Sequence, residues 1–179
     1  MRLAGLLPER ILYRVNTPKW ASMPTSGAGA AAEGGRFNRA GVEALYLSLD
    51  ETTALREYQQ DEPIMPPGTI AAYHVALDQV VDFSAGFVAG EWAPLWEDWN
   101  CNWRGLRFLD GITPPSWDIG DLVLEAKVPG LLFPSTRNPG GINLVVYTDL
   151  VDGSDRRRIR VHDPEGKLPK TRASWAPPT

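Results

Sequence analysis

The chain has 179 residues, a formal net charge of −4 and a hydrophobic share of 43%, which fits one ordinary globular domain. The negative charge argues against a protein that binds nucleic acid by bulk electrostatics. A single cysteine, Cys101, excludes an intramolecular disulfide and a cysteine-based zinc cluster, and two histidines argue against a histidine-rich metal site.

The N-terminal half is predicted to contain short strands and one helix. Ile11–Val15 and 44–49 are rich in strand-forming residues, and 69–77 predicts a third strand. Asp50 is a candidate N-cap for a helix over 51–60, where apolar side chains recur at helical spacing.

The segment 21–35 is rich in small residues and is predicted to be a flexible loop beside a site. Gly27–Ala32 matches the loose dinucleotide pattern G-x-G-x-x-A. That motif requires a strand just before it and a helix that starts on it. No strand pattern precedes this run, and Gly34 and Gly35 interrupt any helix, so we discard a Rossmann site.

The C-terminal half is predicted to begin with helices and end with strands. Apolar residues recur at amphipathic helical spacing over 91–104 and 116–127, the latter with Ser116 as its cap. Five of the seven tryptophans fall between Trp92 and Trp117, which indicates a core anchored by large rings. Three strands follow, at 131–133, 142–147 and 156–162. Because strict β-α-β alternation is missing, we predict a single α+β domain with a mixed or mostly antiparallel central sheet.

The C-terminal segment from Gly153 to Thr179 carries seven basic and three acidic residues, a charge of +4 that leaves −8 for the rest. A basic tail can bind nucleic acid or an acidic partner, but a solvated edge strand with a loose terminus is the favoured interpretation. We place the domain at 1–165 and a Pro-rich basic tail at 166–179. No transmembrane-length apolar run is present, and the apolar stretch 3–7 is too short for a signal peptide, so we expect a cytoplasmic protein.

Five polar residues stand in apolar or glycine-rich surroundings and are the candidate site. Arg14 lies inside an apolar strand, where an uncompensated buried guanidinium is unfavourable. Arg36 follows two glycines, and Tyr46 faces away from its neighbours in the second strand. Glu57 lies on the predicted helix, and Ser135 follows a short apolar strand.

These residues belong to a series of runs that resembles the RES domain family, in the same order from about residue 11 to about 165. The family is named for an Arg, a Glu and a Ser, which map here to Arg36, Glu57 and Ser135, while Arg14 and Tyr46 match two further family positions. The runs are Tyr13-Arg14, Gly34-Gly-Arg-Phe-Asn38, Gly41, Leu45-Tyr-Leu-Ser48, Thr53-Ala54 with Glu57, Pro134-Ser135 and Gly140-Gly-Ile-Asn-Leu-Val145.

The resemblance implies the toxin of a bacterial toxin–antitoxin pair, with a fold similar to that of ADP-ribosyltransferase toxins. It further implies NAD+ as the substrate, without a metal, and an Xre-type antitoxin that occludes the active site. Family members have been assigned hydrolysis or phosphorolysis of NAD+ and also transfer of ADP-ribose to a protein, and the residues do not choose between these acceptors.

The chemistry of NAD+ cleavage matches the residue types. The reaction passes through an oxocarbenium-like transition state, which the carboxylate of Glu57 would stabilise. Arg14 and Arg36 are suited to bidentate contacts with the pyrophosphate. Tyr46 can stack on the cationic pyridinium ring, and Ser135 can bond a ribose hydroxyl or the nicotinamide amide.

Two other classes of function remain open from the sequence. In a non-catalytic binding module, Arg14 and Arg36 would hold an anionic ligand or a partner carboxylate, and Glu57 would be their salt-bridge partner. In a ribonuclease toxin, the basic tail would grip RNA. The charge of −8 on the body and the lack of a suitable histidine pair for acid–base work argue against the ribonuclease.

Overall fold

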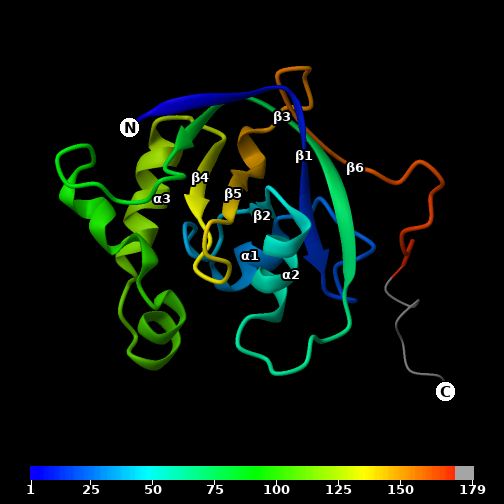
Figure 1. Ribbon diagram of the computed structural model, residues 1–179, viewed down its shortest axis with the longest axis horizontal. Helices are drawn as coiled ribbons and strands as arrows, with labels where there is room; N and C mark the ends of the chain where they lie inside the picture. Colours follow the sequence, from blue (N-terminus) through cyan, green and yellow to red (C-terminus); the bar gives the residue numbers. More distant parts are fainter. Residues whose placement is uncertain (172–179) are drawn as a thin grey trace.

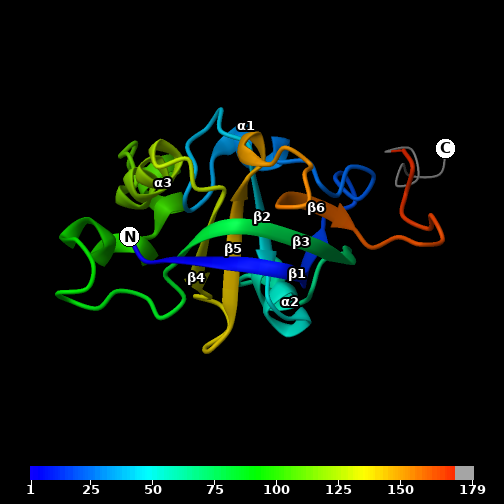
Figure 2. The same ribbon diagram turned by 90° about the horizontal axis from the view of Figure 1, so that it is seen from above.

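The computed structural model describes residues 1–171, in which six strands form one strongly bent sheet. The order is β1-β2-β5-β4-β3-β6, and β1 also pairs with β3, so the sheet folds back on itself. The long β1 and β3 cross the direction of β2, β4 and β5 (Figure 2). Most pairings are antiparallel and that of β3 with β4 is parallel, which confirms the predicted α+β domain with a mixed sheet. The strands are β1 (Leu3–Asn16), β2 (Ala44–Ser48), β3 (Thr69–Asp82), β4 (Gly130–Pro134), β5 (Ile142–Tyr147) and β6 (Arg157–Val161).

Two apolar cores lie on the two faces of the strands β2, β5 and β4. Alternate residues of each strand point to opposite faces, so Leu144 enters one core and Val145 the other. The first core fills the space between these strands and the long β1 and β3. The second lies against the α-helix α3 (Pro115–Glu125), which stands beside β4 and β5 in Figure 1. A sheet with apolar side chains on both faces therefore supports the site residues of β1 and β2.

The helix α2 (Glu51–Gln59) forms where the sequence predicts it. Its N-cap is Asp50, whose carboxylate accepts a hydrogen bond of 2.8 Å from the backbone N–H of Thr53. The helix α3 begins at Pro115 without a side-chain cap, so the prediction of Ser116 as its cap is wrong. Ser116 is instead buried inside the first turn. Among residues 1–171, no helix is long and apolar enough to cross a membrane.

The prediction of an amphipathic helix over 91–104 is wrong. The chain forms a 3₁₀ segment over Pro94–Asn100, broken at Asp98, and then a π-helical turn over Gly105–Leu109. Aromatic packing explains the difference, because Trp92, Trp96 and Trp99 surround the ring of Phe83 with centroid distances of 4.8, 4.9 and 5.7 Å. These contacts determine the backbone path in place of helical propensity.

The segment 21–35 also differs from the prediction of a flexible loop. It contains the short helix α1 (Ala28–Glu33), which ends at Gly34 with a φ of +91°. That backbone region favours glycine, so the glycine that interrupts the sequence pattern is the residue that ends the helix. A short 3₁₀ turn, Thr148–Leu150, links β5 to the chain before β6.

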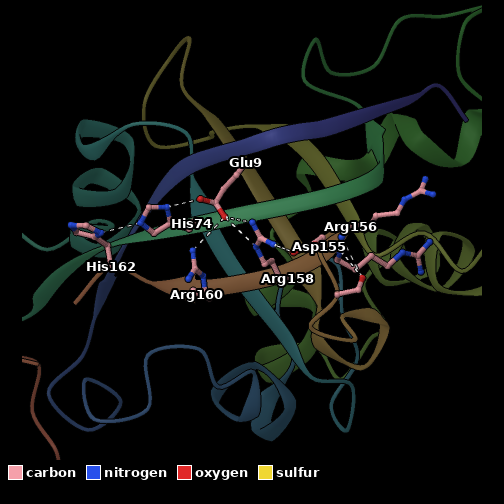
Figure 3. Close-up of polar contacts among 9 residues, drawn as sticks. Glu9, His74, Asp155, Arg156, Arg158, Arg160 and His162 are labelled. Atoms are coloured by element: carbon pink, nitrogen blue, oxygen red, sulfur yellow. Dashed lines mark hydrogen bonds and ion pairs between the residues drawn. The ribbon is translucent and has the colours of Figure 1, made fainter. Parts of the chain in front are cut away.

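The basic C-terminal segment forms the edge strand β6, whose arginines pair with acidic residues of the body. Figure 3 shows Glu9 of β1 between His74 and Arg158. Glu9 accepts hydrogen bonds from both, at 2.8 and 3.2 Å, and Arg157 donates to Asp78 at 2.8 Å. The described part of the basic segment is thus a solvated, ion-paired edge; the predicted tail continues through 172–179, outside the described residues.

Candidate active site

A cavity of about 380 Å³ opens where β1, β2, α2 and the loop after α1 meet. Its volume lies within the usual range for small-molecule sites. Four of the five predicted residues line it, namely Arg14, Arg36, Tyr46 and Glu57. The fifth, Ser135, lies behind Glu57 and is buried. Residues that are far apart in the chain therefore meet around one space.

Glu57 is held by two neutral donors on the same carboxylate oxygen. Its Oε1 accepts hydrogen bonds from the hydroxyl of Ser135 at 2.7 Å and from the amide of Asn143 at 2.6 Å. No ion pair joins Glu57 to a cation among residues 1–171, which leaves its charge uncompensated by direct contact. The carboxylate is therefore oriented by its neighbours while Oε2 remains available.

The hydroxyl of Ser135 uses all of its hydrogen-bonding capacity where it holds the Glu57 carboxylate. Its Oγ accepts hydrogen bonds from the backbone N–H groups of Arg137 and Asn138, at 3.1 and 2.9 Å. With both lone pairs used in this way, the hydroxyl proton points to Glu57. The structure therefore places Ser135 as a support of the carboxylate, behind the cavity wall.

The loop after β4 lies tightly against the first turn of α2, and this contact brings Ser135 to Glu57. A Cβ on Gly141 would stand 2.3 Å from Oγ1 of Thr53, so only glycine permits this approach. The amide of Asn138 donates to the same Thr53 hydroxyl at 2.9 Å. Gly141 thus has a packing role next to the site, while Gly140 before it adopts a positive φ of +84° that favours glycine.

Arg14 carries the least satisfied polar group of the cavity. Its Nη1 is buried and has no hydrogen-bond partner among residues 1–171, and burial lowers the pKa of its guanidinium. A buried donor without a partner costs about 1–3 kcal/mol. Arg14 also lines the cavity and has no ion-pair partner among residues 1–171, so its positive charge favours an anionic ligand there.

Arg36 is fixed by the tryptophan-rich segment. Its Nη1 donates to the backbone carbonyls of Trp99 and Cys101, at 3.1 and 3.0 Å. Burial lowers the pKa of the guanidinium, while the nearby charge of Glu57 acts in the opposite direction. The aromatic cluster around Phe83 thus gives Arg36 a rigid anchor, a function that the sequence did not indicate.

Tyr46 presents its ring to the cavity while its hydroxyl is engaged elsewhere. The hydroxyl accepts from the backbone N–H of Phe37 at 2.9 Å and donates to Asn38 at 2.8 Å. Burial raises the pKa of Tyr46, so the phenol stays protonated. A Cβ on Gly35 would stand 2.5 Å from this hydroxyl, so that glycine makes room for a protein side chain as well as bordering the cavity.

A model of the RES domain matches residues 11–171 of the chain. The chain belongs to the RES domain family. Of the three residues that the resemblance assigns to the family's Arg, Glu and Ser, Arg36 and Glu57 line this cavity and Ser135 contacts Glu57.

Two known proteins resemble this RES domain along most of its length. A protein named Toxin Res from Yersinia enterocolitica is 28% identical over 137 residues, covering 76% of this chain and 82% of its own. A chain in the crystal structure of the MbcT–MbcA toxin–antitoxin complex of M. tuberculosis superimposes with a TM-score of 0.54 at 19% identity. That match covers 87% of this chain and 85% of the other, which shows a shared fold.

Three further polar residues that the sequence did not single out line the cavity. Arg104 lines the cavity, donates to Gln60 at 3.1 Å and stacks on the ring of Trp103 at 4.6 Å. Arg137 lines the same wall, and Asn143 holds Glu57. Arg104 ends the run that predicts a helix over 91–104 and Arg137 lies in the loop after β4, and neither position marks a site, whereas Asn143 was visible as a polar residue inside an apolar strand.

Proposed function

We propose that this RES domain is the toxin of a bacterial toxin–antitoxin pair and that it cleaves the nicotinamide–ribose bond of NAD+. One observation carries the proposal: Arg14, which has no ion-pair partner among residues 1–171, and the oriented carboxylate of Glu57 line one cavity of about 380 Å³. NAD+ offers a matching pair of features, an anionic pyrophosphate and a ribose that becomes cationic as the bond breaks. The names of the relatives, Toxin Res and the MbcT–MbcA toxin–antitoxin complex, support the toxin role.

The proposed reaction breaks the bond between the ribose C1′ and the pyridinium nitrogen. The electron pair of that bond goes to the nitrogen, so nicotinamide leaves as a neutral molecule and needs no general acid. Positive charge develops on the ribose, and the carboxylate of Glu57 stabilises it through the oxygen that its neighbours leave available. A nucleophile then attacks C1′ and takes the ADP-ribosyl group.

The other cavity residues bind and orient the substrate in this proposal. Arg14 and Arg36 contact the pyrophosphate, to which guanidinium groups make strong charge-assisted hydrogen bonds. The ring of Tyr46 stacks on the pyridinium and holds it against the wall of the cavity. Ser135 supports Glu57 from behind the carboxylate, and because its hydroxyl is fully used there, this proposal does not include the direct contact with the ribose or the nicotinamide amide that the sequence suggested.

The decisive experiment measures release of nicotinamide from NAD+ by the purified chain, with Glu57→Gln as the matched control. Release by the wild type, and release about 10²–10³-fold slower by the variant, is the expected result. Binding of NAD+ without release would favour a non-catalytic anion-binding module. The acceptor is identified by repeating the assay with and without phosphate and by adding labelled NAD+ to a cell lysate. Free ADP-ribose indicates water, ADP-ribose 1″-phosphate indicates phosphate, and a labelled band indicates a protein.

A ribonuclease function has less support. Arg157 and Arg158 of the basic segment already pair with Asp78 and Glu9, which reduces their availability for RNA. Cleavage of RNA by the purified chain that survives Glu57→Gln would overturn the NAD+ proposal in favour of this alternative.

A toxin that consumes NAD+ in the cytoplasm of its own cell needs an inhibitor, and we propose a cognate Xre-type antitoxin as partner. Arg14 and Arg36 would accept a carboxylate of the antitoxin in place of the pyrophosphate. Saturating antitoxin should then abolish NAD+ binding, as calorimetry with the Glu57→Gln chain would show. A ternary complex of toxin, antitoxin and NAD+ in native mass spectrometry would contradict this competitive model.

A further inference from the structure

A polar pair on two inner strands of the sheet lines the cavity beside Glu57. Ser48 ends β2 and Asn143 is the second residue of β5, and the register of the two strands places them directly opposite each other. Their exposed fractions are only 3% and 4%. Their neighbours in these strands are mostly apolar, so this pair interrupts an otherwise hydrophobic interior.

The hydrogen bonds of this pair have one consistent direction that ends at Glu57. A carboxylate only accepts, so the amide nitrogen of Asn143 must face Oε1 of Glu57, at 2.6 Å. The amide oxygen of Asn143 therefore faces Ser48, whose hydroxyl donates to it at 2.7 Å. The chain from Ser48 through Asn143 to Glu57 has no freedom to reverse.

We infer that Asn143 is a positioning residue for the carboxylate of Glu57 and that Ser48 fixes the orientation of the Asn143 amide. The inference rests on the proposed function of Glu57. The other donor to Oε1, Ser135, starts an irregular loop, whereas Asn143 is held on both sides by the neighbouring strands β2 and β4. Asn143 thus ties the reacting carboxylate to the most rigid part of the fold.

Loss of this tie is expected to lower turnover more than substrate binding. A carboxylate displaced by a fraction of an ångström still contributes its charge to the cavity, so substrate binding changes little. It stabilises the oxocarbenium poorly, however, and a misplacement of about 1 Å can lower the rate about 10²-fold. For Asn143→Ala we expect about a 10- to 100-fold lower kcat with a KM for NAD+ within about threefold of the wild type.

The kinetic test combines single and double variants. In the Glu57→Gln chain, adding Asn143→Ala should leave the residual turnover unchanged, because there is no carboxylate left to position. A further loss in the double variant that multiplies the single losses would show a general structural role and overturn the inference. Ser48→Ala should reproduce part of the loss and Ser48→Thr, which keeps the hydroxyl, should restore it.

A spectroscopic test separates this inference from the proposed function. In the ¹⁵N-labelled full chain, the side-chain amide resonances of Asn143 should shift in Glu57→Gln and in Ser48→Ala. They should not shift in Thr52→Ala, a control at an exposed position of the same helix. If these shifts are seen but the wild-type chain does not release nicotinamide, the proposed function is refuted while the contact between Asn143 and Glu57 stands. Wild-type NAD+ cleavage with unchanged Asn143 resonances in both variants would overturn the inference alone, even where Asn143→Ala does not fold.

Discussion

Three charged residues of the cavity lack ion pairs of the kind that charges on the outer face of β3 and β6 form. On the outer face, Glu9 is shared by His74 and Arg158, and Arg157 pairs with Asp78 (Figure 3). Around the cavity, among residues 1–171, Arg14, Arg36 and Glu57 form no ion pair with one another or with other residues.

Under the proposed function, this difference separates charges that hold the fold from charges with which a ligand would pair. Partnered surface charges contribute modestly to stability and attach an edge strand. Unpartnered charges in a cavity destabilise the free protein, and a ligand that pairs with them recovers the loss on binding. Each prediction below changes a charged residue of the cavity or of the outer face and gives the expected effect on turnover, NAD+ affinity or stability.

The largest expected effect is that of Glu57→Gln on turnover. The substitution keeps the size and hydrogen bonding of the side chain but removes the charge that faces the oxocarbenium, so the rate of nicotinamide release should fall about 10²–10³-fold. Affinity for NAD+, measured by calorimetry, should remain close to that of the wild type. A variant that keeps more than about a tenth of the rate would exclude Glu57 from this role.

Arg14→Ala and Arg36→Ala should weaken NAD+ binding in the Glu57→Gln background, where turnover does not interfere. A charge-assisted hydrogen bond to phosphate contributes about 1.5–3 kcal/mol, which corresponds to roughly a 10- to 150-fold higher Kd. Arg158→Ala on the outer face is the matched control and should leave the Kd unchanged. Equal Kd values in all three variants would place the pyrophosphate elsewhere.

Much of this site follows from the sequence because its residues lie in regular, local patterns. The cap at Asp50 and the alternation of β2 place Glu57 and Tyr46, and the structure brings both to the cavity with Arg14 and Arg36. Asn143 could be noticed but not assigned, since its contact with Glu57 depends on a cross-strand register that no local pattern encodes.

The remaining differences come from tertiary packing. The tryptophan-rich segment has the spacing of a helix, but the grouping of its rings around Phe83 sets its path and brings two backbone carbonyls to Arg36. A 3.6-residue period predicts that the apolar side chains lie on one side of the segment. Rings as large as tryptophan can reach a common core from a 3₁₀ segment as well, so the period alone does not establish an α-helix.

The third prediction concerns the stability of the free protein. Arg14→Met should keep the packing of the aliphatic stem while removing the unsatisfied Nη1, so the free energy of unfolding should stay equal or rise by about 1–3 kcal/mol. Urea unfolding of the free chain measures it. The same variant should bind NAD+ poorly, and a clear loss of stability would show that Arg14 holds the fold instead of a ligand.

The smallest effect is expected from the partnered face, where Glu9 makes stability depend on pH. Burial alone would raise the pKa of Glu9, but the hydrogen bonds and charges of His74 and Arg158 outweigh it and lower the pKa below its usual value. A carboxylate with a lowered pKa in the folded state adds stability above its unfolded pKa, near 4.3, and this stability is lost as the pH falls through the folded pKa. The urea midpoint of the wild type should therefore fall more steeply between pH 5 and about pH 3 than that of Glu9→Gln.

Release of nicotinamide at neutral pH should be the same in both chains, because Glu9 lies outside the residues that line the cavity. Identical acid dependence in the two chains would show that the Glu9 contacts do not stabilise β6, and altered catalysis would show that the two faces are coupled.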